Sequence, residues 1–340
     1  MMAKIVRRKA TSFDVARLAG VSRSAVSRAF TPGANIAPDT KDKVTKAASE
    51  LGYRVNSLAR GLQQAHSGIV GLVASRLDTP LRSQQVRQLS EALTREGFKP
   101  MLITAERPDE VSSLIESLLG YSIAGMIFTS DTPPRALIED CGRLGLPVVL
   151  VNRAGASNWG DRVVADNAQA GQLATRVLIQ AGATCLGCLV PRRETYSVSG
   201  RAKAFLSSAA KHGLPTEVLY AADQGYEDAR VGLNGTDRSV FDRIDGLFCS
   251  TDLMAIGALD ALRIDLGISV PDQIQVLGFD DIEQAKWGSF NLSTIRQDIE
   301  AQTDTVVRLL IERIADSSLA NRVERQPLAA VLRGTTRHDG

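Results

Sequence analysis

The stretch Phe13-Asp-Val-Ala-Arg-Leu-Ala-Gly-Val-Ser-Arg-Ser-Ala-Val-Ser-Arg-Ala-Phe30 predicts two short helices joined by a tight turn. Apolar residues recur in it at helical spacing: Val15, Leu18, Ala19, Ala25, Val26, Ala29 and Phe30. Gly20 suits the turn, because glycine adopts a left-handed backbone without steric cost. Ser22 suits the N-cap of the second helix. This pattern is typical of a helix-turn-helix.

The second of these helices also carries a polar and basic face, formed by Arg23, Ser24, Ser27 and Arg28. Side chains at the start of such a helix can reach base edges in a DNA major groove. Residues 1–66 hold 12 Lys/Arg and 4 Asp/Glu, a net charge of +8, whereas the remainder holds 28 and 34, a net charge of −6. A basic head on an acidic body favours DNA binding over a merely solvated basic surface.

Length and composition indicate a globular protein of two or three domains. The 340 residues are 44% hydrophobic and 23% charged, and no apolar run approaches the roughly 20 residues that span a bilayer. The basic N-terminus has no apolar segment behind it, so we expect no secretory signal and no membrane partner. Four cysteines are too few for a disulfide framework and favour a reducing, cytoplasmic location.

The pair Cys185-Leu-Gly-Cys188 has the spacing of a redox or zinc motif. It falls in an expected strand over 184–190, where residues three apart point to opposite faces. No second pair and no clustered histidine accompanies it, since the histidines are His66, His212 and His338. We therefore interpret these cysteines as structural, and expect no metal and no cofactor.

A third helix is expected over 39–51, with Pro38 at its first position and an apolar stripe of Val44, Ala47, Ala48 and Leu51. The segment Asn56–Leu62 is helix-like but too short to be stable alone. We expect it to be a hinge that orders only when something packs against it, followed by a linker over 63–68.

From Ile69 onward, apolar strand-like runs alternate with amphipathic helical segments. Strands are expected at 69–75, 99–105, 123–130, 147–152, 184–190, 217–222, 245–250, 274–279, 293–298 and 328–332. Helices are expected at 83–96, 109–120, 135–145, 166–181, 199–212, 253–266 and from 299 to about 315. This rhythm predicts two doubly wound parallel sheets with a ligand cleft between them. The change from one lobe to the other is expected near 162–166.

The predicted domains follow from these segments. A helix-turn-helix DNA-binding domain occupies 1–55, and a hinge helix with its linker occupies 56–67. An effector-binding α/β domain of two lobes, of the periplasmic-binding-protein-like type, occupies 68–340. We assign about 68–163 and 293–324 to the first lobe, and about 164–292 and 325–340 to the second.

Three motifs carry a resemblance to a known family: Asp14-Val-Ala-Arg-Leu-Ala-Gly-Val-Ser22, Leu51-Gly-Tyr-Arg-Val-Asn-Ser-Leu-Ala-Arg-Gly-Leu62 and Val276-Leu-Gly-Phe-Asp-Asp-Ile-Glu283. They resemble the LacI/GalR family of bacterial transcription regulators, from Thr11 to about Arg333. The resemblance implies a homodimeric repressor that reads a pseudo-palindromic double-stranded operator. It also implies a body that senses a small metabolite, a sugar or sugar acid.

The resemblance also assigns roles to residues. Arg23, Ser24 and Arg28 match positions that face bases, Thr11, Ser12, Ser22 and Asn35 match positions that touch or flank phosphates, and Ser27 and Arg60 join this DNA-binding set. Leu62 matches a hinge leucine that wedges into the minor groove, as an apolar side chain between base steps can. Effector-contacting positions are matched by Asp166, Arg201, Thr251, Asp280 and Arg82.

The chain departs from the family's pattern at several places. Thr31 stands where asparagine is usual, and Thr251-Asp252 replaces an Asn-Asp pair. Thr79-Pro80-Leu81-Arg82 replaces Asn-Pro-Phe-Phe, which removes an aromatic stacking face and adds a positive charge near the cleft mouth. Phe290-Asn291 replaces a Pro-Pro turn. These changes favour an anionic or smaller effector over a neutral hexose.

A ligand carrier and an enzyme are the two alternative functions. A ligand carrier of the periplasmic type would share the body but would need neither the basic head nor a cytoplasmic location. An α/β enzyme is disfavoured, because the sequence has no Gly-x-Gly-x-x-Gly, Gly-x-Ser-x-Gly, Walker A or metal-ligand motif. We therefore expect no enzymatic activity.

Overall fold

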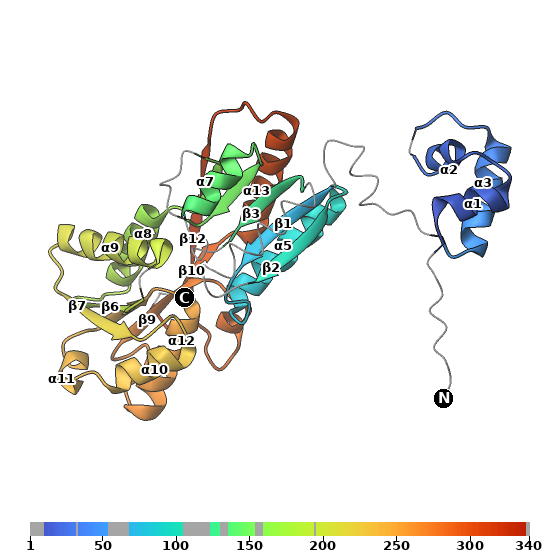
Figure 1. Cartoon of the computed structure of the whole chain (residues 1–340). Helices are drawn as coiled ribbons and strands as arrows, with labels where there is room; N and C mark the ends of the chain where they lie inside the picture. The colour runs from blue at the N-terminus through green and yellow to red at the C-terminus, as the bar shows by residue number, and fades with distance from the viewer. Residues whose placement is uncertain are drawn as a thin grey trace, which may run out of the picture. The chain divides into compact units, whose positions relative to one another are not determined.

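A computed structural model of the chain describes residues 10–31, 33–53, 68–104, 123–129, 135–153, 159–193 and 195–337. The chain divides into two compact units, Met1–Ser67 and Gly68–Gly340 (Figure 1). We call the described parts of these units the head and the body, and describe each by itself. The expected hinge over 56–62 and the expected helix over 109–120 lie outside the described residues.

The head consists of three helices, α1 (Ser12–Ala19), α2 (Arg23–Ala29) and α3 (Pro38–Glu50). Thr11 and Asp14 form a capping box at the start of α1, and Gly20 ends this helix with a φ of +66°. The Ser22 hydroxyl accepts a hydrogen bond from the Ala25 N–H, which confirms the expected N-cap of α2.

A small apolar core joins the three helices of the head. Its buried members are Val15, Ala16, Val26, Ala29, Val44, Ala47 and Ala48. Two residues expected in this core lie largely in solvent, since Leu18 is 47% and Leu51 is 37% exposed. Three short helices enclose too little volume to cover every apolar position of each stripe.

The body contains two six-stranded sheets. The first has the order β11-β5-β4-β3-β1-β2, with strands Val323–Gln326, Asp161–Ala165, Val148–Val151, Gly125–Phe128, Ile69–Ala74 and Lys99–Thr104. The second has the order β12-β10-β9-β8-β6-β7, with strands Leu328–Val331, Ser293–Gln297, Gln275–Asp280, Gly246–Cys249, Leu186–Pro191 and Thr216–Ala221. All neighbours are parallel except β12, which runs antiparallel to β10.

Helices cover both faces of each sheet (Figure 1), which explains why β1, β3, β4 and β8 are apolar along their whole length. On the first sheet, α5 (Pro80–Arg95) and α13 (Ile299–Ala315) pack on one face and α7 (Arg135–Arg143) packs on the other. On the second sheet, α8 (Asn167–Gln180) and α9 (Tyr196–Lys211) pack opposite α10 (Tyr226–Asn234) and α12 (Asp252–Asp260). Short helices complete the body: α11 (Arg238–Phe241), a π-helix at Ala261–Asp265 and a 3-10 helix at Glu283–Lys286.

The chain passes between the two lobes three times, and a single residue separates the elements at each crossing. Asp166 lies between β5 and α8, Asp298 between β10 and α13, and Pro327 between β11 and β12. The predicted lobe boundary at 293 was therefore wrong: β10 belongs to the second sheet, and the chain returns to the first lobe only after it. Both sheets accept a short apolar strand, so local sequence does not decide which one β10 joins.

All ten expected strands are present, but five elements were not predicted: β5, β11, α10, α11 and the 3-10 helix at Glu283–Lys286. The strand β11, Val-Glu-Arg-Gln, is a charged edge strand without an apolar run. The helix α10 buries only Ala229 and Leu233 of the residues along its length. Weak burial leaves little periodicity in the sequence to detect.

The structure confirms the structural interpretation of the cysteine pair. Cys188 is fully buried in β6 against the cluster beneath α8 and α9, and burial raises the pKa of its thiol to about 12. Cys185 precedes the strand and packs against the opposite cluster. The two thiols therefore lie on different faces of the sheet.

One buried carboxylate joins distant parts of the first lobe. Asp161, at the start of β5, accepts hydrogen bonds from Arg313 Nε at 3.0 Å and Nη2 at 2.8 Å, and from Arg322 Nη2 at 2.9 Å. Burial raises the pKa of Asp161, but the hydrogen bonds from both arginines outweigh burial and leave this pKa lowered. A lowered pKa means that the stabilisation holds at neutral pH and is lost as pH falls through that value.

Asp161→Asn is therefore expected to lower the free energy of unfolding of the body by about 3–5 kcal/mol, because it leaves two arginine charges without a buried partner. Both tryptophans, Trp159 and Trp287, belong to the body, so urea unfolding followed by tryptophan fluorescence reports on this unit. The matched control is Asp140→Asn, which removes an exposed pair with Arg143 at 3.0 Å and is expected to cost under about 1 kcal/mol. Equal, small losses in both variants would contradict the role of Asp161.

Candidate functional site

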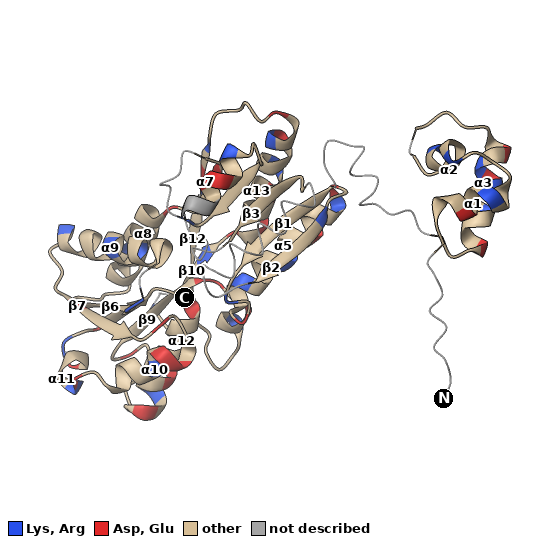
Figure 2. Cartoon of the chain, viewed as in Figure 1, with Lys and Arg blue, Asp and Glu red and all other residues tan. Residues whose placement is uncertain are grey.

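The head presents a polar face along α2. Its exposed members are Ser22, Arg23, Ser24, Ser27 and Arg28. Arg28 Nε donates to the Ser24 carbonyl at 3.4 Å, and the hydroxyls of Ser22 and Ser24 lie 2.8 Å apart. Figure 2 marks the basic residues on α2 and α3. The structure thus places the five predicted α2 residues on one accessible surface, as major-groove contact requires.

The other predicted DNA-contacting residues are distributed around this face. Thr11 and Ser12 lie half-buried at the start of α1, where the Thr11 hydroxyl takes part in the capping box. Asn35 is exposed in the loop before α3. Arg60 and Leu62 lie outside the described residues, so their roles remain predictions.

A cavity of about 340 Å³ lies between the two lobes of the body. The first lobe lines it with Ser75, Arg76, Thr79, Pro80, Leu81, Arg82, Gln85, Thr129 and Asn152. The second lobe lines it with Arg193, Thr195, Ser197, Val198, Arg201, Gln224, Thr251, Leu253, Asp280, Ile282 and Gln297. Its size suits a small ligand, and its position at the carboxyl ends of parallel strands is where open α/β sheets bind ligands.

Three lining residues have a left-handed backbone where strands end. Arg76 follows β1 with a φ of +57°, Asn152 follows β4 with a φ of +51°, and Asp280 ends β9 with a φ of +128°. Such a backbone is costly for residues other than glycine and collects at functional sites. At these three positions the strain aims polar groups into the cleft.

Arg201 is the most deeply buried cation of the cavity, at 3% exposed. Its Nη1 donates to the Ser250 carbonyl at 2.6 Å and lies 3.8 Å from Asp280 Oδ1, while its guanidinium carbon lies 3.7 Å from the centre of the Phe279 ring. Its Nε is buried and has no hydrogen-bond partner. Burial lowers the pKa of Arg201, and the charges of Asp280 and Asp252 act against that shift.

Arg201 belongs to α9, which packs closely against α8 on the same face of the second sheet. At Gly171 of α8, an added Cβ would lie 2.3 Å from the backbone of Ala204 and Phe205 in α9. Only glycine permits this approach, which explains why residue 171 is glycine. This close approach fixes the position of α9, the helix that carries Arg201, beside α8.

Asp280 is the carboxylate of the cavity among the described lining residues. Its Oδ1 accepts a hydrogen bond from Gln297 Nε2 at 2.6 Å. Burial raises the pKa of Asp280 to about 6, although the charge of Arg201, the Gln297 hydrogen bond and the charge of Arg82 all lower it. Ionised Asp280 can accept hydrogen bonds from ligand hydroxyls.

Asp252, next to the predicted Thr251, is buried behind the cavity. It accepts hydrogen bonds from Thr294 Oγ1 at 2.5 Å and from the Ile282 N–H at 2.9 Å. Burial and the charge of Asp280 raise the pKa of Asp252 to about 7. Thr251 itself lines the cavity and caps α12 through the Met254 N–H. Asp252 therefore supports the walls of the site.

Arg82 enters the cavity from the first turn of α5. Its Nη1 donates to Gln85 Oε1 at 2.9 Å, and Gln85 Nε2 donates to Gln302 Oε1 at 2.8 Å. This chain orients the Gln85 amide with its oxygen toward Arg82. The structure thus brings four of the five predicted effector residues, Arg82, Arg201, Thr251 and Asp280, to one cavity.

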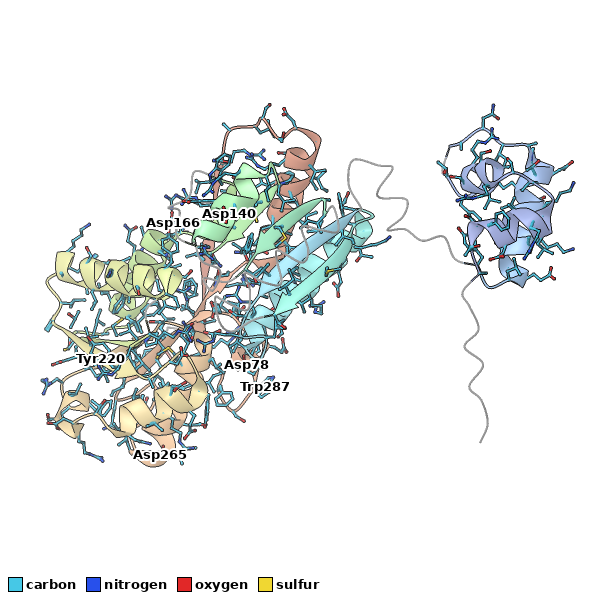
Figure 3. The ribbon with its side chains drawn as sticks, viewed as in Figure 1. Asp78, Asp140, Asp166, Tyr220, Asp265 and Trp287 are labelled. Carbon is cyan, nitrogen blue, oxygen red and sulfur yellow. The ribbon has the colours of Figure 1, made fainter. Side chains whose placement is uncertain are left out.

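The fifth predicted effector residue, Asp166, does not line this cavity. It lies at the start of α8 (Figure 3), where its carboxylate accepts hydrogen bonds from the N–H groups of Ala168 and Gln169. A polar residue after a buried strand can either bind a ligand or cap the following helix. Here the Asp166 carboxylate caps α8, because it accepts hydrogen bonds from two N–H groups that have no partner within the helix.

Several lining residues were missed by sequence reasoning. Asn152 joins both lobes: its Nδ2 donates to Gln297 Oε1 at 3.2 Å, and its carbonyl accepts from Ser197 Oγ at 2.9 Å. Arg76 pairs across the lobes with Asp223, at 2.7 Å. The signal available for Arg76 and Asn152 was the same as for Asp280, a polar residue just after an apolar strand.

The described ranges contain no group of three or more His, Cys, Asp or Glu side chains arranged to hold a metal ion. Across the same ranges, no helix has both the length and the apolar composition that a membrane crossing requires.

Two family descriptions match the chain. Residues 13–56 match the bacterial regulatory proteins of the lacI family, and residues 175–336 match a periplasmic binding protein-like domain. The HTH-type transcriptional repressor PurR of Vibrio parahaemolyticus is 28% identical over 331 residues, which cover 96% of this chain and 99% of that protein.

Solved structures agree with these matches. The lac repressor dimer bound to operator and the anti-inducer ONPF shares the fold, with a TM-score of 0.86 at 21% identity over 97% of this chain and 100% of that one. The complex of the transcriptional regulator CelR with cellobiose gives a TM-score of 0.71 at 25% identity over 96% and 99%. Residues 13–56 thus form a DNA-binding domain of the lacI family of bacterial regulatory proteins, and a periplasmic binding protein-like domain follows it at residues 175–336.

Proposed function

We propose that this protein is a sequence-specific transcriptional repressor whose affinity for operator DNA is controlled by a sugar or sugar acid. It acts in the cytoplasm, as a homodimer on a pseudo-palindromic double-stranded operator. The observation that carries the proposal is the pairing of two features in one chain: an exposed basic helix face and a ligand-sized cavity with a buried Arg201–Asp280 pair.

The head supports the DNA-binding part of this proposal. Arg23 and Arg28 offer forked donors that suit guanine edges or phosphates, and Ser24 and Ser27 offer hydroxyls between them. Thr11, Ser12, Ser22 and Asn35 surround this face and are proposed to contact or flank phosphates, which fix the register of the head on the duplex.

The cavity supports the effector part. Hydroxyl and amide groups from both lobes line it, and the similar CelR structure contains cellobiose. Arg82, Arg201, Thr251 and Asp280 are proposed as effector contacts. The effector can shift the protein only through unequal affinity for two arrangements of the lobes. We propose that this change determines whether the hinge over 56–62, with Arg60 and Leu62, orders on DNA.

The alternative functions are a ligand carrier and an enzyme. A carrier would use the same cavity but would have no use for the basic face of α2. The relative with full-length coverage is named a repressor, which supports a regulator without enzymatic activity.

Duplex binding tests the proposed function. Fluorescence anisotropy with a random duplex, followed by selection of genomic fragments, is expected to yield a palindromic site. Affinity should fall steeply between about 50 and 200 mM salt, because arginines and lysines displace counterions from phosphates. A chain that binds no duplex at the lower salt concentration would refute a regulator.

Arg23→Ala is expected to relax the base preference at one position of each half-site by about 1–3 kcal/mol, because Arg23 is proposed to read a base edge. The measurement is competition between operators that differ at single base pairs. Arg17→Ala is the matched control, since Arg17 lies on α1 and pairs with Asp14. An unchanged preference in Arg23→Ala would move this residue to a phosphate-contacting role.

Arg201→Lys is expected to keep operator affinity but to raise the effector concentration for half-maximal response by at least about tenfold, because lysine lacks the planar fork of arginine. The effector for this titration comes from thermal-shift screening of sugars and sugar acids, since a bound ligand raises the unfolding midpoint. Arg192→Lys is the control, because Arg192 stacks on Tyr220 outside the cavity. Equal responses of both variants would remove Arg201 from the effector site.

A further inference from the structure

The arginines of the cavity are shared between the two lobes. Arg76 and Arg82 come from the first lobe, and Arg193 and Arg201 come from the second. Asp280 is the carboxylate among the described lining residues, and Asp223 lies against Arg76 and Arg193, so four arginines face two carboxylates. A small cavity with this surplus of positive charge attracts an anion.

The four arginines form two pairs, and each pair draws one member from each lobe. Arg76 and Arg193 lie 2.7 and 3.8 Å from the two oxygens of Asp223. Arg82 and Arg201 both stabilise the charge of Asp280. Two arginines thus share one carboxylate in each pair. When the lobes come together, positive charge therefore exceeds negative charge near both Asp223 and Asp280.

A comparison of two buried arginines shows what Arg201 lacks. Arg313 donates from Nε and Nη2 to the two oxygens of Asp161, at 3.0 and 2.8 Å. Arg201 has its nearest carboxylate oxygen at 3.8 Å, that oxygen already accepts from Gln297, and the Arg201 Nε has no acceptor. A buried donor without an acceptor costs free energy, and a guanidinium fork matches a carboxylate or phosphate best.

The rest of the lining argues against a ligand held by apolar contact. Ligand pockets are usually lined mainly by apolar and aromatic side chains. Here the apolar members are Pro80, Leu81, Val198, Leu253 and Ile282, and no described lining residue is aromatic. Hydroxyls and amides fill the remaining positions, which suits a small molecule that carries several hydroxyl groups.

We infer that the effector is an anion, a small polyhydroxylated molecule whose carboxylate or phosphate group binds between Arg82 of the first lobe and Arg201 of the second. The inference rests on the proposed function, because it names the chemical class of the molecule in that same cavity. Arg82 is then the residue that selects a charged effector over its neutral parent. The anion also stabilises the closed arrangement, since it neutralises cations from both lobes.

Matched sets of ligands test this inference on the full chain. Thermal shift followed by calorimetry compares D-glucose, D-galactose and D-ribose with D-gluconate, D-glucuronate, D-galacturonate and D-ribonate, and with glucose 6-phosphate, galactose 6-phosphate and ribose 5-phosphate. At least one anion should bind about tenfold tighter than its neutral parent, as charge-assisted hydrogen bonds are roughly twice as strong as neutral ones. The acid and phosphate arms distinguish the two sources of the negative charge.

A pair of variants on one helix then separates specificity from general charge. Arg82→Gln should reduce the preference for the anion over its parent to about twofold or less, because glutamine keeps polarity without charge. Arg87→Gln, one turn further along α5, removes an exposed arginine that pairs with Glu91 and does not line the cavity, and it should keep the preference.

The inference is overturned if a neutral sugar binds as tightly as its anions, if no anion of the panel binds, or if both variants behave alike. Operator binding is measured in the same samples. A neutral sugar that alters operator binding would refute the proposal of an anionic effector, but it would support the proposed regulatory function. Absence of any duplex binding would instead refute the proposed function.

Discussion

The first lobe depends on one buried carboxylate that holds together segments far apart in the chain. Asp161 opens β5, while Arg313 and Arg322 belong to the stretch that returns after the whole second lobe has been built. Their ion pairs fasten α13 and the approach to β11 onto a sheet whose other strands lie between 69 and 165. Because Asp161 and Arg313 are buried and both arginines donate to the carboxylate, these ion pairs specify where the returning chain docks as well as stabilising it.

Much of this fold is visible in local sequence, for a physical reason. Strands of a parallel sheet covered on both faces are mostly apolar, so runs such as Ile69–Ala74 and residues 276–279 stand out. The edge strand β11 is charged and half in solvent, which removes that signal. Sheet membership is harder still, because pairing partners of β10 are decided by contacts across the molecule, and two sheets of like composition compete for the same strand.

The candidate site was predictable to a similar extent. Arg201 and Asp280 could be named because they match effector-contacting positions of the family that the sequence resembles. Asp280 also directly follows an apolar strand, and the fold brings both residues to one cleft. Asp166 also matches such a position and follows a strand, but its carboxylate caps α8. The ion pair of Arg76 with Asp223 could not be foreseen, because the two residues are 147 positions apart in the chain and lie in different lobes. The Arg201 Nε without an acceptor is likewise a property of three-dimensional packing alone.

The three single-residue crossings have a mechanical consequence. Asp166 and Asp298 have nearly the same backbone angles, with φ of −76° and −81° and ψ of 94° and 92°, and each caps the helix that follows. Pro327 at the third crossing has a ring that restricts its φ. With two soft dihedrals per residue, rotation of one lobe against the other is absorbed by about five or six torsions. Ordering so few torsions costs little conformational entropy, so little of the difference in a ligand's binding free energy between the two arrangements is lost at the joint.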